Sequence, residues 1–169
     1  MLGITPFGMF HTILGLIAVV LGFIALLRFG RIGMTTRTGR GYVWFTVATC
    51  ITGFFIFHRG GFGKPHILGI VTLVTLAIAW AAERRAAPSG GYLGPLLFTL
   101  SLFFHFIPGY TETLSRVPLD APYVTGPDDP KLLRLVGGTF VVFLVGMAVQ
   151  ALRLRARNRA PLGTNTLAR

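Results

Sequence analysis

Long apolar stretches separated by short polar ones dominate this chain of 169 residues. A helix needs roughly 20 mostly apolar residues to cross the hydrocarbon core of a bilayer. Five stretches reach this length or come within a few residues of it: residues 7–27, 42–58, 66–82, 92–108 and 132–152. The pattern predicts one all-α transmembrane domain of five helices, with a long loop at 109–131 and a basic tail at 153–169.

The composition supports this prediction. Hydrophobic residues make up 53% of the chain and charged residues only 12%, whereas a soluble domain carries about 25% charged residues. The single cysteine, Cys50, excludes an internal disulfide. The net charge of +11 does not indicate nucleic-acid binding, because the basic residues fall between the apolar stretches and no nucleic-acid module is recognisable. The bilayer is the expected partner.

The basic residues also predict an orientation, because cytoplasmic loops are enriched in Lys and Arg. Alternate connections hold eleven basic residues: Arg28, Arg31, Arg37, Arg40, Arg84, Arg85, Arg153, Arg155, Arg157, Arg159 and Arg169. The remaining connections hold five, together with four of the five acids. We therefore expect the N-terminus and the loop 109–131 outside and the C-terminus in the cytoplasm. Candidate contacts with anionic lipid headgroups are Arg28, Arg31, Arg37, Arg40, Arg153 and Arg155.

A weak internal repeat relates the first two helices to the next two. His11 opens the first helix ahead of Gly15, and His66 opens the third ahead of Gly69. The second and fourth helices both end in Phe-rich segments with a histidine, His58 and His105. Both pairs run in the same direction, so the repeat predicts a pseudo-two-fold axis along the membrane normal.

All four histidines of the chain are thus expected at one level near the outer side. Ionisable groups within a membrane are costly and usually functional. The faces of His11, His66 and His105 also carry small residues, whereas the face of His58 is bulky, which makes His58 the least secure member. The glycines expected to serve helix packing are Gly15, Gly22 and Gly69.

Three chemistries suit such a histidine layer. Haem b could be held by His11 with His66, or by His58 with His105, across the bundle. Three or four imidazoles could instead bind zinc or copper. Proton or quinone handling is the third, because histidine titrates near neutral pH. A redox role at a haem or metal site is the leading hypothesis.

Other functions stay open at this point. The chain could be a cofactor-free accessory subunit of a larger membrane complex, or a homo-oligomer, packed through its glycines. A small transporter ranks third, because no helix combines a break with buried acids. Whether the chain is an enzyme is not decided, although motifs of the standard soluble classes are lacking.

Part of the sequence resembles a family of predicted bacterial inner-membrane proteins of unknown function. The resemblance lies in His11-x-x-x-Gly15 with Gly22, in residues 38–42, and in residues 62–69 with His66, and it covers residues 8–110. It implies a small multi-helix protein of the bacterial inner membrane. The arrangement is also similar to small transmembrane b-type cytochromes, in which histidines of neighbouring helices ligate haem. The single histidine level departs from their two-haem version.

Overall fold

The computed structural model describes residues 5–57, 61–86 and 91–159, and the regular elements in these ranges are all helices. They are α1 (Pro6–Phe29), α2 (Arg37–Gly53), α3 (Lys64–Arg85), α4 (Leu93–Phe104), α5 (Phe106–Leu114) and α6 (Pro130–Arg159). α4 and α5 form one apolar helical run, Leu93–Leu114. Together with α1, α3 and α6 it gives four helices, within the described ranges, that are long and apolar enough to cross a membrane. The all-α prediction is confirmed, and α2, with 17 residues, is a shorter fifth helix.

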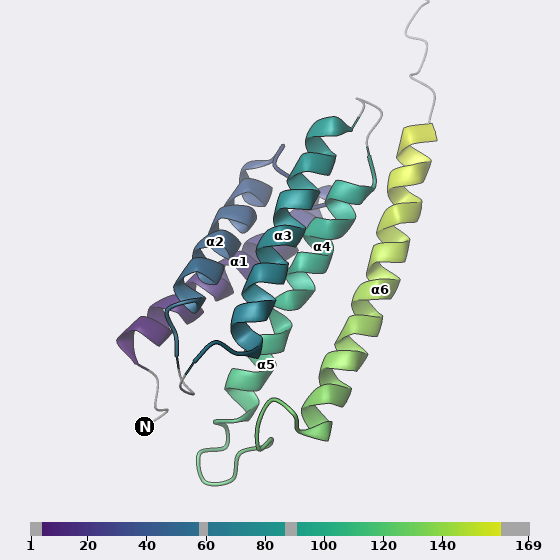
Figure 1. Cartoon of the computed structure of the whole chain (residues 1–169). Coiled ribbons are helices and arrows are strands. Elements are labelled where there is room, and N and C mark those ends of the chain that lie inside the picture. The colour runs from purple at the N-terminus through teal and green to yellow at the C-terminus, as the bar shows by residue number, and fades with distance from the viewer. Residues whose placement is uncertain (1–4, 58–60, 87–90, 160–169) are drawn as a thin grey trace, which may run out of the picture.

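The helices run up and down, as Figure 1 shows. α1 packs along α2, α3 packs along α4, and α6 lies beside α4 and α5. The start of α1 and residues 115–129 lie at one end of the bundle, which we call the loop end. The α1–α2 connection and the end of α6 lie at the opposite end, which we call the arginine end. The predicted separation of basic and acidic connections is therefore a separation between the two ends of the bundle.

The bounds of α2 differ most from the prediction of residues 42–58. The Thr36 hydroxyl accepts a hydrogen bond from the Gly39 N–H at 3.0 Å and caps the helix, so that the helix begins at Arg37. Such a cap stabilises a helix start. The helix also ends earlier than expected, at Gly53. Polar residues that the hydropathy pattern assigned to a loop thus form the first turn.

The predicted fourth helix, residues 92–108, continues to Leu114 with an interruption at His105. The His105 N–H bonds the Leu102 carbonyl three residues back, at 3.2 Å, which is the tighter pattern of a 3₁₀ turn. α5 then begins anew at Phe106. Pro108 therefore stands in the first turn of α5, where its missing N–H is not required. The predicted loop starts at 115 and not at 109.

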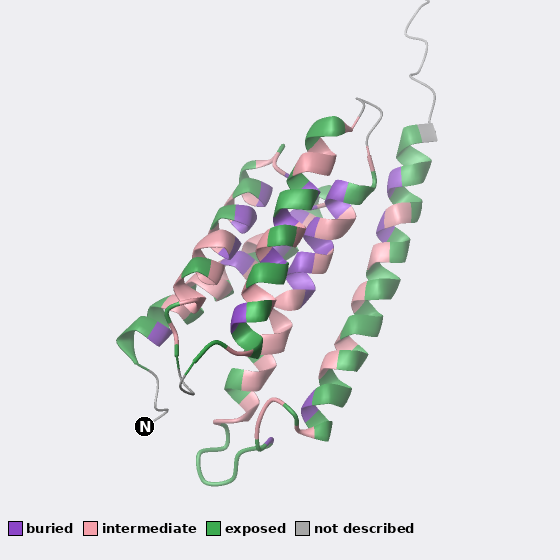
Figure 2. Ribbon diagram, in the orientation of Figure 1, coloured by how far each residue is buried: buried purple, intermediate pink, exposed green. Residues whose placement is uncertain are grey.

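The core lies between α1, α2, α3 and α4, where the buried residues in Figure 2 turn inward. Ala25, Tyr42, Phe98 and Leu102 have no exposed surface. A Cβ added to Gly22 of α1 would lie 2.9 Å from Leu102 and 3.1 Å from Tyr42. This glycine therefore brings the backbone of α1 close to α2 and α4, as small residues do in membrane bundles.

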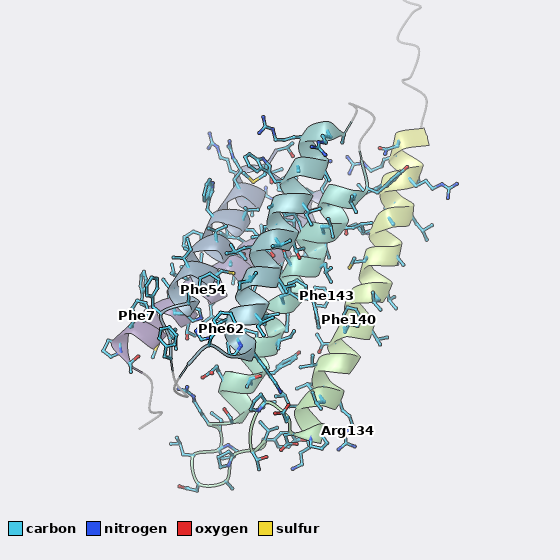
Figure 3. The ribbon with its side chains drawn as sticks, in the orientation of Figure 1. Phe7, Phe54, Phe62, Arg134, Phe140 and Phe143 are labelled. Atoms are coloured by element: carbon cyan, nitrogen blue, oxygen red, sulfur yellow. The ribbon has the colours of Figure 1, made fainter. Side chains whose placement is uncertain are left out.

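α6 packs on α4 and α5. Phe103 meets Phe140 and Phe143 across this contact, with ring centroids 5.0 and 5.7 Å apart (Figure 3). A Cβ added to any of the three glycines of α6 would meet nothing within 4 Å. Phenyl rings and the hydrogen bonds of Thr139 and Gln150, and not glycines, hold α6.

The outer faces of the helices are apolar. Leu16, Val20, Leu27, Val142 and Val145 are each more than half exposed. Such a surface would be exceptional on a soluble monomer, and it is what helices in lipid present. The arrangement is compatible with a multi-pass membrane protein.

Candidate functional site

α2 presents a face of threonines toward α1 and α4. Thr46, Thr49 and Thr52 follow one another at three-residue steps, which keeps them near one side of a helix. Each hydroxyl donates its proton to the backbone carbonyl four residues back at 2.8 Å, with Tyr42, Phe45 and Ala48 as the acceptors. Because the hydroxyl protons are used in this way, the three oxygens face neighbouring side chains as acceptors.

His11 of α1 contacts this threonine face. Its Nδ1 lies 2.9 Å from the Thr52 hydroxyl oxygen. Since the Thr52 oxygen is the acceptor, Nδ1 carries the proton and Nε2 holds the lone pair of the neutral ring. Gly53 makes room for the ring, because a Cβ there would lie 3.1 Å from His11 Cε1.

His105, which lies at the junction of α4 and α5, contacts the same threonine face of α2. Its Nε2 lies 3.0 Å from the Thr46 hydroxyl oxygen, and its ring meets the Tyr42 ring edge-on at 6.2 Å. The Thr46 hydroxyl donates its proton to the Tyr42 carbonyl. Nε2 of His105 is therefore the donor to the Thr46 oxygen, and Nδ1 of His105 holds the lone pair. Tyr42 is held in turn by its hydroxyl, 2.6 Å from that of Ser101.

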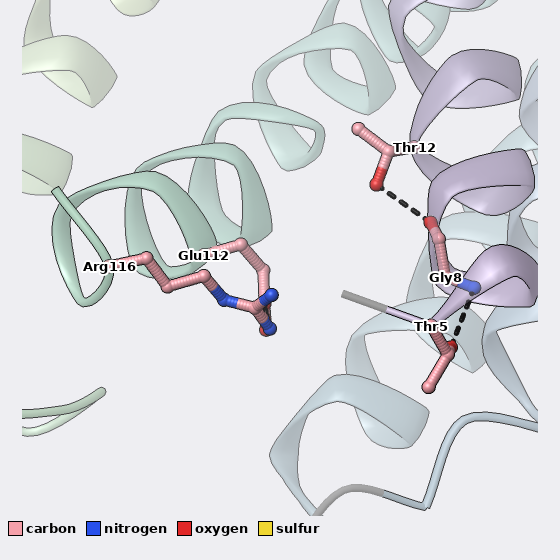
Figure 4. A network of polar contacts seen from close by, with 5 residues as sticks. All are labelled: Thr5, Gly8, Thr12, Glu112 and Arg116. Atoms are coloured by element: carbon pink, nitrogen blue, oxygen red, sulfur yellow. Dashed lines mark hydrogen bonds and ion pairs between the residues drawn. The ribbon is translucent and has the colours of Figure 1, made fainter. Parts of the chain in front are cut away.

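Both histidines contact one face of α2, His11 through Thr52 and His105 through Thr46. Glu112 of α5 forms an ion pair with Arg116 at the loop end, shown in Figure 4. A lone pair on His11 and another on His105 thus lie in one polar region inside an otherwise apolar bundle.

His66 occupies a different environment. Its Nδ1 accepts the Gly63 N–H at 3.2 Å and so caps the start of α3. The neutral ring must then carry its proton on Nε2, and this buried atom has no hydrogen-bond partner among the residues that the structure describes. The ring is stacked on three phenylalanines, Phe54, Phe57 and Phe62. His66 therefore presents a buried donor, whereas His11 and His105 present acceptors.

Two of the four predicted site histidines, His11 and His105, contact the same threonine face of α2. The contacts of His66 are with Gly63 and three phenylalanines, and its predicted pairing with His11 stays a prediction. His58 lies outside the described residues, so its predicted pairing with His105 has no structural counterpart here. Within the described ranges, no three or more His, Cys, Asp or Glu side chains are grouped so that they could hold a metal ion.

The other predicted positions are distributed over the bundle. The candidate headgroup arginines lie on the connection and helix ends of the arginine end; five are exposed, and Arg31 donates to Thr35 at 3.0 Å. A Cβ added to Gly69 would lie 2.9 Å from Phe54, and one added to Gly15 would lie 3.5 Å from Thr49. These two glycines, like Gly22, lie at helix contacts.

Sequence reasoning missed two sets of polar residues. The first is the threonine face, whose regular spacing was a usable signal. The second lies at the arginine end, where Glu83 of α3 accepts the Met34 N–H at 2.8 Å and keeps its other carboxylate oxygen buried without a partner. Gln150 of α6 donates to the Gly30 carbonyl at 3.1 Å nearby. As the only acid among the basic connections, Glu83 could have been singled out from the sequence.

No protein-family model, curated protein or solved structure matches the chain. The resemblance to an uncharacterised inner-membrane family stays an expectation, and the case for function depends on the geometry alone.

Proposed function

We propose that this chain is a small integral membrane protein with a redox role, whose site is formed by His11 and His105 and binds haem b. The observation that carries the proposal is the hydrogen bonding of the two rings. Each imidazole has one nitrogen within 3.0 Å of a threonine oxygen whose hydroxyl is also within hydrogen-bonding distance of a backbone carbonyl, so we assign the shared proton to the imidazole. Each other nitrogen is thereby left with a lone pair, the form in which histidine ligates a metal.

The residues fit a haem iron better than they fit zinc. Histidine ligands of metals almost always donate their second nitrogen to a neighbouring oxygen, which fixes tautomer and orientation. Thr52 and Thr46 supply such oxygens to His11 and His105. His11 and His105 would be the two residues that hold haem b, whereas a structural zinc site needs four ligands. When bound, haem would supply one-electron chemistry, and the threonines would hold its ligands in place.

We further propose that the protein lies in the bacterial inner membrane with its N-terminus outside and its C-terminus in the cytoplasm. Support comes from the eleven basic residues of the arginine-end connections and tail and from the positive-inside rule. The histidine pair belongs to the opposite half of the bundle, close to α5 and the loop end. The site would then be nearer the outer surface than the cytoplasm.

The test is the composition and visible spectrum of the protein purified from membranes. We expect a haem band that is lost in His11→Ala and in His105→Ala and kept in His66→Asn, which changes a histidine of the separate environment. Elemental analysis for iron, zinc and copper distinguishes haem from a two-histidine metal site. A colourless protein that holds none of these metals and takes up no added haem contradicts the proposal.

A second candidate function is that of an accessory subunit in a larger membrane complex or homo-oligomer. The specific observation is α6, which touches the bundle along one side and leaves Gly137, Gly138 and Gly146 without neighbours within 4 Å. Exposed glycines allow another helix to approach closely. Native mass spectrometry from mild detergent tests this. A strict monomer in every detergent, with no co-purifying partner, counts against it.

A further inference from the structure

The side chain of His66 is enclosed by aromatic rings at the loop end of the bundle. The rings of Phe57 and Phe62 are stacked on it with centroids 5.1 Å away, and Phe54 is stacked at 6.5 Å. The labels in Figure 3 place Phe54 and Phe62 close together beside the start of α3. We call these three phenylalanines and His66 the aromatic cage. Only 5% of the His66 surface is exposed.

The cap of α3 does not explain why His66 is so deeply enclosed. Capping uses Nδ1 alone, and a shorter polar side chain performs it with no further buried polar atom. Nε2, by contrast, is buried and has no hydrogen-bond partner within residues 5–57, 61–86 and 91–159. A buried donor without an acceptor costs about 1–3 kcal/mol. Such a donor is expected where an external acceptor binds.

The chemistry of the cage defines the acceptor. A metal cation does not fit, because Nε2 carries the proton. An anion would be buried among phenyl rings without a counter-charge, which is costly. A planar conjugated ring with a carbonyl oxygen fits both features. Its oxygen accepts the Nε2–H in the plane of the imidazole, and its faces lie against phenyl rings that favour stacking.

The position of the cage indicates where the ligand enters. Phe57 and Phe62 are 58% and 66% exposed, so two walls of the cage lie on the outer surface of the bundle. A ligand that arrives from the lipid phase meets these rings first. Rotation of either exposed ring would open the way to Nε2 without disturbing the core. The ligand is therefore expected to be lipophilic.

We propose that the aromatic cage binds the headgroup of a membrane quinone, with the Nε2–H of His66 donated to one quinone carbonyl. The proposal concerns binding only and does not depend on the haem site, because the cage lacks both His11 and His105. It assigns to His66 a donor role in place of a ligand role. The phenyl rings hold the conjugated ring, and the hydrogen bond selects the carbonyl.

The test is a titration of the purified protein with a benzoquinone that carries a single isoprene unit and ¹³C-labelled carbonyls. Calorimetry measures affinity, and infrared spectroscopy follows the carbonyl stretch, which moves to lower wavenumber when the oxygen accepts a hydrogen bond. We expect saturable binding of about one quinone per chain and a shifted carbonyl band. His66→Asn should keep the cap through its side-chain oxygen, lose the shifted band and bind about tenfold more weakly, equivalent to about 1.4 kcal/mol.

Two phenylalanine variants form a matched pair. Phe62→Leu removes a cage ring and should weaken binding, whereas Phe55→Leu removes a ring that is 68% exposed and is not stacked on His66, and should leave binding unchanged. Helix content by circular dichroism shows that each variant is folded. Absence of saturable binding to the wild type overturns the proposal. Equal affinity and an equal carbonyl shift in folded His66→Asn overturn it as well. Neither outcome bears on haem binding, which is measured separately.

Discussion

Replacement of Thr46 by valine tests how the histidine pair is built. Valine has nearly the same shape but no oxygen, so the Nε2–H of His105 loses its acceptor at 3.0 Å. Thr46 has no exposed surface, and water cannot readily replace it. A buried donor left unpaired destabilises the folded state by about 1–3 kcal/mol. The additional buried methyl group of valine stabilises it by about 0.8 kcal/mol. We expect Thr46→Val to destabilise the bundle by about 1 kcal/mol.

A double-mutant cycle separates this hydrogen bond from the change in packing. In His105→Phe the donor is absent, so Thr46→Val should cost much less in that background. The expected coupling between the two positions is about 1–2 kcal/mol, within the range for residues that share a hydrogen bond. Unfolding in mixed micelles of rising dodecyl sulfate content, followed by circular dichroism, measures each free energy.

The ¹⁵N shifts of the imidazoles give a second and more direct measurement. The wild type should show His105 protonated on Nε2 and His11 protonated on Nδ1, and Thr46→Val should release the preference at His105 alone. Additive free energies in the cycle, together with unchanged nitrogen shifts in Thr46→Val, would refute the reasoning. Thr46→Ser is the matched control, because it keeps the oxygen and should keep the tautomer.

Three further predictions concern the bundle around the site. Gly22→Ala should cost about 1–3 kcal/mol by overpacking two buried side chains, whereas Gly146→Ala, which faces open space, should be neutral or stabilising in the same micelle titration. Gln150→Leu should cost about 1–2 kcal/mol, because it breaks hydrogen bonds to two other helices, while the exposed Val149→Leu should cost almost nothing. Backbone N–H groups of Thr125 and Lys131 hold the pKa of the Asp129 carboxyl below its usual value, so its stabilisation is present above about pH 4 and lost as the pH falls further. The melting temperature should thus fall as the pH drops below about 4 in the wild type and less so in Asp129→Asn; parallel profiles would contradict this.

The sequence predicts the number and order of the helices well, because apolar length alone determines them. It predicts the bounds of α2 poorly. Arg37 and its polar neighbours read as a loop, but the Thr36 cap makes them a helical turn. Likewise, Pro108 reads as a helix end, yet the interruption at His105 places it in a first turn, where proline is tolerated. Local hydrogen bonds decide these bounds, and hydropathy does not contain them.

The histidine layer was predicted in part. Counting residues along each helix locates His11 and His105 near the same end of the bundle. Which histidines meet depends on how each helix is rotated about its axis, and that rotation is set by packing contacts such as Gly22 against Tyr42 and Leu102. The repeat matched His66 with His11 by position, but the cap with Gly63 gives His66 the opposite hydrogen-bonding role.

The central claim is that His11 and His105 are paired as ligands and that His66 is not one of them. The most direct measurement is the absorption spectrum of the cofactor-free protein during titration with haem b. The wild type and His66→Asn should give the spectrum of six-coordinate, low-spin iron at one haem per chain. Each of His11→Ala and His105→Ala should give a five-coordinate spectrum or no specific binding. A six-coordinate spectrum that survives in both alanine variants, or one that is lost in folded His66→Asn, would contradict the account.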